Sequence, residues 1–425
     1  MNDSNKMLID FSFENFASYR DAVHFSMKAT ADKTNEKGSV SGVGKDRILR
    51  CSAIYGANGS GKSNFVHAFI YVHRIVSDSK SVKDWNPSGN YFRLDNSSKT
   101  KPSYFELNFN YDGLKYRYGF ESNLKKVFSE WLFVSKSTRE TKLFTREGMK
   151  VSLGKSFINA SKLVSHLKSD RLFLNLADEN KILDAENVVD WIKFTRIQSG
   201  IFDTSGSLYT RHILKDHDEE DRQKILNILK TFDTQINDIY IINKDTHERV
   251  EKTDRVKKKS MLSRLKKTRA RYDIAITRKA YEGGKVVGET QFELGEESNG
   301  TQRLVGLSAL LIDVLDHGYP MVVDELEAKL HPLITKKIIE IFNSSKLNKS
   351  NSQIIFTTHD TNLLAGNGLR RDQVWFTEKD KRGLSHIYSL AEFKPRKDSS
   401  FEKNYIEGRY GAVPYLGNIN DILSE

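Results

Sequence analysis

The chain has 425 residues, of which 38% are hydrophobic and 11% aromatic, enough apolar material for the core of one large or two ordinary domains. Because it contains no run of 18 apolar residues and begins with the polar residues Met1–Ser4 rather than a signal peptide, we expect a globular cytoplasmic protein that does not enter a membrane. Its single cysteine, Cys51, excludes an intramolecular disulfide.

The formal net charge of +11 is unevenly distributed, since thirteen Lys and Arg residues and only three acidic residues lie between Arg249 and Lys279. A segment of this composition is either a solvated surface or a surface that binds the phosphates of DNA or an acidic protein. Its one aromatic residue, Tyr272, does not predict base stacking.

At the N-terminus, alternating apolar residues over 8–13 and around 23–25 predict two strands that form an edge hairpin. Between them lies Tyr19, whose ring either packs in the core or stacks on an adenine base. The polar, glycine-containing range 30–47 is typical of a loop.

The range Gly56–Ser63 fits the phosphate-binding pattern G-x-x-x-x-G-K-[ST] at every position. An apolar run before it predicts a buried strand, and apolar residues at helical spacing from Phe65 to Val76 predict a helix after it, which is the setting of a P-loop. Lys62 is expected to reach the β- and γ-phosphates, and the hydroxyl of Ser63 to bind Mg²⁺. We therefore expect ATP to be bound by Gly56, Asn58, Gly59, Gly61, Lys62, Ser63 and Asn64.

The range after the P-loop helix predicts a β-rich lobe, with a hairpin around the turn Tyr111-Asp112-Gly113 and further strands at 131–135 and 142–144. From 159 to 232, leucine, isoleucine and valine recur at helical spacing, which predicts a helical insertion. A strand is expected at 236–243, before the basic segment.

The range Glu297–Arg303 is a polar turn that precedes an apolar helix expected at 304–315. Ser298 and Gly300 lie next to this helix N-terminus, whose unpaired N–H groups favour anions. The turn is therefore suited to contact a second nucleotide, although a turn followed by a helix has no chemical role in many proteins.

Two apolar strands are expected to end in catalytic residues. One leads into Asp324 and Glu325, which suit the binding of Mg²⁺ and the polarisation of the attacking water, respectively. The other leads to His359, 35 residues after Asp324, whose imidazole is suited to contact the γ-phosphate. A helix expected at 333–344 separates the two strands, and a connection of this kind places both strand ends at one edge of a parallel sheet.

With its parts in this order, the sequence resembles an ABC-type ATPase head of the SMC/RecF branch, an α/β fold in which a mixed β sheet with flanking helices carries a helical insertion. More narrowly, it resembles the bacterial AAA15/AAA21 ATP-binding proteins, which include the ATPases of RloA-like abortive-infection systems against phage. The resemblance covers nearly the whole chain and includes residues 11–18, 297–303, 325–332, 402–405 and 408–414. The sequence departs from the family pattern in one respect, because no lid glutamine follows the P-loop helix.

The resemblance implies a homodimer, or a higher homo-oligomer, in which each P-loop holds ATP and Mg²⁺ against Ser298 and Gly300 of a second copy. It also implies a sensor or scaffold that controls a separate effector, commonly a nuclease. The alternative is a RecF-like DNA-repair ATPase that binds DNA through Arg249–Lys279. A self-contained nuclease is disfavoured because only 66 residues follow His359, and a transporter subunit because of the insertion and the missing glutamine.

Along the chain we expect three domains. These are an N-terminal ATPase lobe at 1–155, a helical insertion with the basic segment at 156–290, and a C-terminal ATPase lobe at 291–425, which would contain the Ser298 turn, the acidic pair and His359.

Overall fold

The structure is a computed structural model that describes residues 6–42, 47–78, 81–84, 90–136, 139–200, 204–216, 219–233, 235–250, 271–365, 368–395 and 399–414. Nine of the thirteen basic residues between Arg249 and Lys279 fall within 251–270 and so lie outside the described residues. The chain forms two compact units, one of Met1–Ser199, His317–Leu326 and Ile338–Glu425, the other of Gly200–Asp316 and Glu327–Lys337. The three-domain division expected from the sequence stays a prediction.

The first unit contains a six-stranded sheet whose first five strands are parallel and whose last strand is antiparallel. The P-loop strand lies in its interior, and every residue of that strand is buried, as the apolar sequence predicted. In sheet order, the strands are β11 (Arg196–Gln198), β15 (Pro320–Val323), β16 (Gln353–Thr357), β5 (Cys51–Gly56), β17 (Val374–Lys379) and β18 (Ser385–Ser389).

A second, antiparallel sheet of seven strands belongs to the same unit and contains the β-rich lobe that the sequence predicted. Alternating side chains along β6 are buried, which is the pattern of a strand with one face on a core. The strands, in sheet order, are β10 (Lys150–Leu153), β9 (Thr141–Glu147), β8 (Val127–Ser135), β7 (Leu114–Ser122), β6 (Ser103–Tyr111), β1 (Leu8–Glu14) and β2 (Val23–Ser26).

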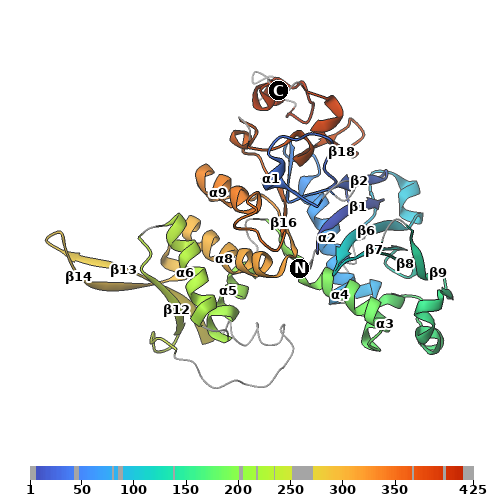
Figure 1. Ribbon diagram of the computed structural model, residues 1–425, viewed down its shortest axis with the longest axis horizontal. Helices are drawn as coiled ribbons and strands as arrows, with labels where there is room; N and C mark the ends of the chain where they lie inside the picture. The colour runs from blue at the N-terminus through green and yellow to red at the C-terminus, as the bar shows by residue number, and fades with distance from the viewer. Residues whose placement is uncertain are drawn as a thin grey trace, which may run out of the picture. The chain divides into compact units, whose positions relative to one another are not determined.

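Helix α2 (Lys62–Ser77) follows the P-loop and packs against β1 of the antiparallel sheet (Figure 1). The ring of Phe11 on β1 lies 4.0 Å from that of Phe69 and 6.1 Å from that of Phe65, measured between centroids. Burial of each such ring stabilises the fold by about 1.5 to 3 kcal/mol. As the helical spacing predicted, the apolar face of α2 is buried at Phe65, Ala68, Phe69, Val72, Ile75 and Val76.

Two further helices of the range predicted to be helical, α3 (Phe173–Glu179) and α4 (Leu183–Phe194), complete the core of this unit. Trp191 of α4 stacks on Phe109 of β6 at a centroid distance of 4.2 Å. The unit also contains several short elements, namely α1 (Glu36–Ser39), the strand pair β3 (Val40–Ser41) and β4 (Ile48–Leu49), and α10 (Phe401–Ile406). Helix α9 (Pro332–Phe342) lies between β15 and β16 in the sequence, where a helix was expected.

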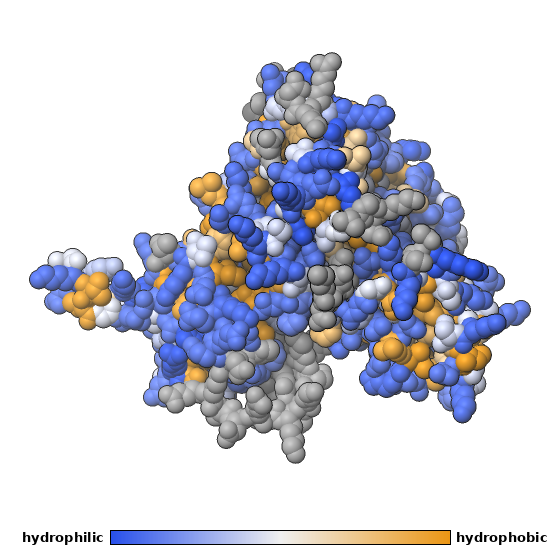
Figure 2. Space-filling model, in the orientation of Figure 1, coloured by the Kyte–Doolittle hydropathy of each residue, from blue (hydrophilic) through white to orange (hydrophobic). Residues whose placement is uncertain are grey.

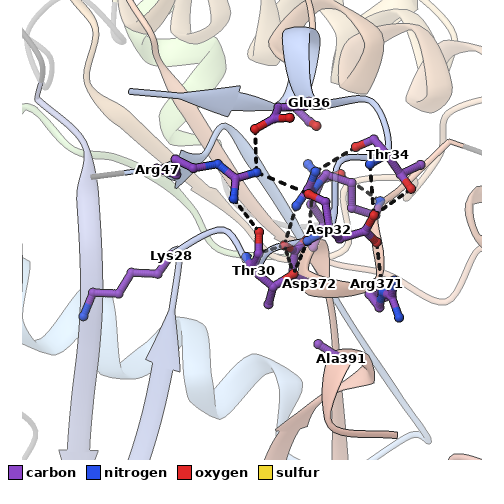
Figure 3. A network of polar contacts seen from close by, with 12 residues as sticks. Lys28, Thr30, Asp32, Thr34, Glu36, Arg47, Arg371, Asp372 and Ala391 are labelled. Carbon is purple, nitrogen blue, oxygen red and sulfur yellow. Dashed lines mark hydrogen bonds and ion pairs between the residues drawn. The ribbon is translucent and has the colours of Figure 1, made fainter. Parts of the chain in front are cut away.

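A polar network fixes the loop that follows β2 (Figure 3). The carboxylate of Asp32 accepts hydrogen bonds from the Thr34 N–H at 3.0 Å and from Arg371 Nε at 2.8 Å. The neighbouring Asp372 accepts from the N–H and the hydroxyl of Thr30, at 2.7 and 2.8 Å. Two acidic residues therefore attach this loop to a segment more than 300 residues away in the sequence.

The second unit contains helices α5 (Ser205–Asp216), α6 (Glu219–Phe232) and α8 (Asn299–His317) and an antiparallel sheet of β12 (Asp238–Asn243), β13 (Tyr272–Glu282) and β14 (Lys285–Glu293). Strand β12 confirms the strand expected at 236–243, and the range expected to be a helical insertion at 156–290 also contains β11 and β13. Beyond the core, β13 and β14 project as a hairpin (Figure 1), and Figure 2 shows apolar side chains at its free end, where Val286 and Val287 are 55% and 59% exposed.

Candidate nucleotide-binding site

The predicted site residues of the first unit follow the carboxyl ends of three adjacent parallel strands. Val323 pairs with Phe356, and Phe356 pairs with Ala53, so the strands that precede Asp324, His359 and the P-loop end at one edge of the sheet. This is the arrangement that the sequence predicted, and this edge is where α/β sheets of this kind bind their ligands.

The P-loop is held against β17 and β18 on one side and is open on the other. A Cβ at Gly61, whose φ is 121°, would lie only 2.5 Å from Ser385 Oγ and 3.0 Å from Tyr19 Oη. A Cβ at Gly59 would meet nothing within 4 Å among the described residues. The hydroxyls of Ser60 and Thr377 lie 2.6 Å apart. A phosphate therefore fits on the open side, where glycine lets the backbone approach it closely.

Lys62 begins helix α2 and is almost completely buried, at 6% exposure. Its Nζ donates to the carbonyl oxygens of Gly56 at 2.7 Å and Ala57 at 3.0 Å, which places the ammonium across the P-loop. Within the described part of the chain, no side chain caps the N-terminus of this helix, whose N-cap is Gly61. The helix N–H groups and the ammonium suit an anion such as the β-phosphate.

Tyr19 and Asn64 both lie next to the P-loop. Tyr19 is fully buried, its Oη donates to Gly61 O at 3.1 Å, and burial raises the pKa of its phenol. Of the two alternatives for this ring, packing is therefore correct and stacking on adenine is wrong. The side chain of Asn64 donates to Ser18 Oγ at 2.8 Å, and its contact with ATP stays a prediction.

Thr357, the last residue of β16, joins the two predicted acids. Its Oγ1 donates to Asp324 Oδ1 at 2.6 Å and accepts from the N–H of Glu325 at 2.8 Å. Asp324 is 5% exposed, and its own N–H donates to Gln198 O of β11. The φ of Glu325 is 52°, a left-handed conformation that costs a non-glycine residue about 1 to 3 kcal/mol and persists only where its surroundings hold it.

The role of Thr357 was not predicted from the sequence. The available signal was a hydroxyl side chain at the end of an otherwise apolar strand, directly before Thr358 and His359. A motif search does not find this residue, because the motifs around it are defined by the acidic residues and the histidine.

His359 and the P-loop line one cavity of about 720 Å³, so the structure brings these predicted site residues together. Gly56, Ala57, Asn58 and Ser60 contribute the P-loop side of this cavity, and His359 and Thr361 contribute the end of β16. The remaining wall had not been assigned to the site and consists of Glu378, Lys379, Tyr405, Ile406, Ala412, Val413 and Pro414.

The residues expected to hold Mg²⁺ have suitable chemistry. Ser63 supplies a hydroxyl in the first turn of α2, and Asp324 supplies a carboxylate at a strand end. In the residues that the structure describes, no three His, Cys, Asp or Glu side chains surround a common metal position. One hydroxyl and one carboxylate suit Mg²⁺, which commonly takes its other ligands from substrate phosphates and water.

The turn around Ser298 lies in the second unit, and its helix begins earlier than expected. Helix α8 starts at Asn299 rather than at 304, because Ser298 Oγ accepts from the Thr301 N–H at 3.1 Å and so caps the first turn. Gly300 is therefore inside this turn, where a Cβ would lie 3.0 Å from Lys329 O. Before the turn, the carboxylate of Glu297 forms an ion pair with Arg278 at 2.8 Å.

No helix among the described residues is long and apolar enough to cross a membrane.

A comparison with curated proteins gives no match. A comparison with solved structures gives matches at low identity. An SMC head bound to the C-winged helix domain of ScpA has 14% identity and a TM-score of 0.43, covering 93% of this chain and 99% of that chain. The SMC head domain from Thermotoga maritima has 14% identity and a TM-score of 0.42, covering 90% of this chain and 98% of that chain.

Residues 51–365, more than half of the chain, match the family described as "AAA domain, putative AbiEii toxin, Type IV TA system". This range begins at the P-loop strand and ends just after His359, and so contains every residue that we expected to contact ATP or Mg²⁺. The P-loop pattern follows an interior strand of the parallel part of the sheet, and the chain belongs to this AAA domain family.

Proposed function

We propose that the protein is a Mg²⁺-dependent ATPase that dimerises, or forms a higher homo-oligomer, around ATP and acts as the sensor or scaffold of a bacterial anti-phage system, controlling a separate effector nuclease. The observation that carries the ATPase proposal is the hydrogen bonding of Thr357 to both Asp324 and Glu325, at the sheet edge that also bears the P-loop. An acidic pair fixed in this way is suited to phosphoryl transfer, in which catalysis consists mainly of positioning and electrostatic stabilisation.

In this proposal the open side of the P-loop binds the β-phosphate through backbone N–H groups, and Lys62 moves its hydrogen bonds from Gly56 and Ala57 to phosphate oxygens. When bound, Mg²⁺ neutralises charge on the phosphate oxygens, and Ser63 and Asp324 hold it. Thr357 holds the strained backbone of Glu325 at the sheet edge, and in this proposal the Glu325 carboxylate orients a water molecule.

Hydrolysis then follows from the groups already in place. The oriented water attacks the γ-phosphorus and gives a proton to Glu325, while the bond between the γ-phosphorus and the bridging oxygen breaks to leave ADP and phosphate. His359, exposed at the cavity wall, contacts the γ-phosphate and loses this contact when phosphate leaves.

Dimerisation is proposed because the Ser298 turn presents the N-terminus of α8, a 19-residue helix, as a second anion site. Ser298 Oγ already accepts one of the first N–H groups, and Gly300 leaves the backbone of the same turn without a side chain. In the proposed dimer this turn of one copy covers the γ-phosphate bound by another copy.

The proposed role in defence is supported by the family description, which names a toxin of a type IV toxin–antitoxin system. The sequence resemblance to ATPases of abortive-infection systems points in the same direction. A chain of this kind would sense a phage or DNA state and would leave the toxic reaction to its effector.

The alternative, a RecF-like DNA-repair ATPase, is supported by the +10 local charge of Arg249–Lys279. Replacement of Lys257, Lys258 and Lys259 by Glu tests it, because each lost phosphate contact reduces the salt dependence of DNA binding. Weaker binding with a flatter salt dependence favours this alternative. Equal affinity of variant and wild type across a salt titration favours a solvated surface.

The ATPase and the dimer are tested together with wild type, Lys62→Ala and Glu325→Gln, with Lys99→Ala, an exposed lysine outside the site, as the control. We expect Lys62→Ala to lose ATP binding, and Glu325→Gln to bind ATP, release little phosphate and accumulate as a dimer in light scattering. Equal phosphate release by wild type and Glu325→Gln would contradict the assigned base. A mass that ATP leaves unchanged would contradict the dimer.

The effector is identified most directly from the neighbouring genes. A nuclease gene beside this one, whose product co-purifies with the ATPase, supports control of an effector. Neighbouring recombination genes favour the DNA-repair alternative instead.

A further inference from the structure

The segment Phe401–Pro414 packs against β17 and β18. Helix α10 opens it, capped by Ser400 Oγ, and the following turn contains Gly411 at φ 67° and Ala412 at φ 59°. A Cβ at Gly411 would lie 2.7 Å from both Glu378 Oε2 and Tyr388 Oη, so this backbone rests directly on the two strands. The C-terminal segment is therefore packed onto the sheet of the first unit.

An aromatic cluster joins this segment to the P-loop strand. Tyr405 of α10 stacks on Phe376 of β17 at 5.2 Å and meets the ring of Tyr55 edge-on at 5.7 Å. Tyr55 is the residue directly before Gly56, where the P-loop begins. Tyr405 is 8% exposed, and its Oη donates to Ala412 O at 3.2 Å, which closes the turn around the ring.

Polar contacts join the same segment to the residues that follow His359. Thr361 Oγ1 donates to Glu402 of α10 at 3.4 Å, and Tyr55 Oη donates to Asp360 O at 3.2 Å. Helix α10 therefore contacts both the end of β5, which leads into the P-loop, and the turn that begins two residues after His359. Tyr405, with Ala412–Pro414, forms the cavity wall that faces these two elements.

We propose that the C-terminal segment completes the phosphate site and that Tyr405 is a positioning residue, which fixes the spacing between the P-loop and His359 through Tyr55. This inference rests on the proposed ATPase function. Its physical basis is that the three aromatic rings pack at van der Waals distance, so their loss lets the two loops move apart. A displacement of about 1 Å in a phosphoryl-transfer site lowers turnover by up to about a hundredfold.

The effect should fall on hydrolysis more than on binding, because the P-loop backbone and Lys62 hold the β-phosphate without help from His359. The Tyr405→Ala variant should therefore retain an ADP dissociation constant within about threefold of wild type, while its kcat falls at least tenfold. The Tyr405→Phe variant keeps the ring and loses only the hydrogen bond to Ala412, so it should recover most of the turnover.

The matched control is Phe393→Ala. Phe393 packs against Tyr388 and Tyr410 at the far end of the same aromatic cluster, at 5.8 and 5.3 Å, and has no ring contact with Tyr55 among the described residues. It should change neither kcat nor the ADP dissociation constant. Thermal unfolding of each variant shows whether the fold is retained.

A second measurement is independent of turnover. Arg409 lies in the turn of the segment with 66% of its side chain exposed, so trypsin can cleave there. We expect saturating ADP to slow this cleavage in the wild type and in Tyr405→Phe, and to have no effect in Tyr405→Ala.

The outcomes separate this inference from the function on which it rests. A wild-type protein that neither binds nor hydrolyses ATP overturns both. A wild type that hydrolyses ATP, together with a Tyr405→Ala variant of equal kcat, overturns this inference alone, as does a Phe393→Ala variant with the same loss as Tyr405→Ala. Cleavage at Arg409 that ADP does not slow in the wild type also counts against it.

Discussion

The hydroxyl of Thr357 donates to the carboxylate of Asp324 over 2.6 Å and at the same time accepts from the N–H of Glu325. Replacement by valine keeps the shape of the side chain and removes both hydrogen bonds. We expect Thr357→Val to lower kcat by about tenfold or more, because the strained backbone of Glu325 is released, and to lower the free energy of unfolding by about 1 to 3 kcal/mol. Phosphate release and urea unfolding measure the two effects.

The control is Thr210→Val in the second unit. Thr210 is also fully buried, and its Oγ1 donates to Val305 O at 2.7 Å. This variant should lose a comparable amount of stability without a loss of kcat. If Thr210→Val and Thr357→Val reduced turnover equally, the role assigned to Thr357 would be wrong.

A methyl group at Gly61 should prevent nucleotide binding. The added Cβ would meet Ser385 Oγ at 2.5 Å and would require an alanine at φ 121°. We expect Gly61→Ala to weaken ATP binding at least tenfold in calorimetry. Gly113→Ala, in the open turn between β6 and β7 at φ 79°, is the matched control and should cost about 1 kcal/mol of stability while leaving ATP affinity unchanged. Equal ATP affinity of Gly61→Ala and wild type would show that the P-loop has another conformation when it binds.

The P-loop and the parallel arrangement of the strands before Asp324 and His359 could be predicted from the sequence because local patterns indicate both. A buried strand, a glycine turn and the apolar face of α2 follow one another within Cys51–Ser77, and each part has its own spacing signal. The parallel pairing of β15 and β16 follows from the helix between them, since this connection permits few arrangements.

The parts that were missed depend on contacts between distant segments. Strand β11 has only three residues and lies in a range with helical spacing, and it is a strand only because it pairs with β15. The packing of Tyr405 on Tyr55 joins residues that are 350 positions apart. A local sequence pattern cannot predict such a contact. The predicted start of helix α8 was too late in the sequence. The first turn of this helix is polar and is stabilised by the Ser298 cap rather than by apolar burial.

Asp32 should make stability depend on pH in the acid range. Burial of this carboxylate opposes its charge, but the Thr34 N–H and the Arg371 guanidinium together hold the pKa of Asp32 well below its usual range. Because the folded pKa lies below the unfolded value of about 4, the stabilisation is fully present above pH 4 and is lost as pH falls further. The contacts that produce it are those of Figure 3.

We therefore expect Asp32→Asn to be less stable than wild type by about 1 to 3 kcal/mol at pH 7, and the difference to shrink at pH 3. Urea unfolding at both pH values measures it. Asp112→Asn, an exposed acid in the turn between β6 and β7, should show little difference at either pH. A constant difference between Asp32→Asn and wild type from pH 7 to pH 3 would contradict the assigned titration.

A fully buried ion pair, Glu130 with Arg146, joins β8 and β9 of the antiparallel sheet. Glu130 accepts from Arg146 at 3.3 Å and from the N–H groups of Phe173 and Leu174 at 2.7 and 2.9 Å, where it meets the start of α3. Burial raises the pKa of Glu130, and Arg146 opposes this shift. Removal of the arginine leaves an uncompensated buried carboxylate, so Arg146→Met should lower the free energy of unfolding by about 3 to 5 kcal/mol.

The sign of the pH dependence provides the sharper test of this pair. In Arg146→Met the folded pKa of Glu130 lies further above its unfolded value, so the folded state binds more protons and stability is recovered as pH falls toward the unfolded value. Glu140→Gln, which breaks the exposed pair with Arg117, should cost less than about 1 kcal/mol and show no such recovery. If Arg146→Met instead lost stability continuously on acidification, the pKa of Glu130 would not be raised in the variant, and the role assigned to Arg146 in compensating a buried carboxylate would be wrong.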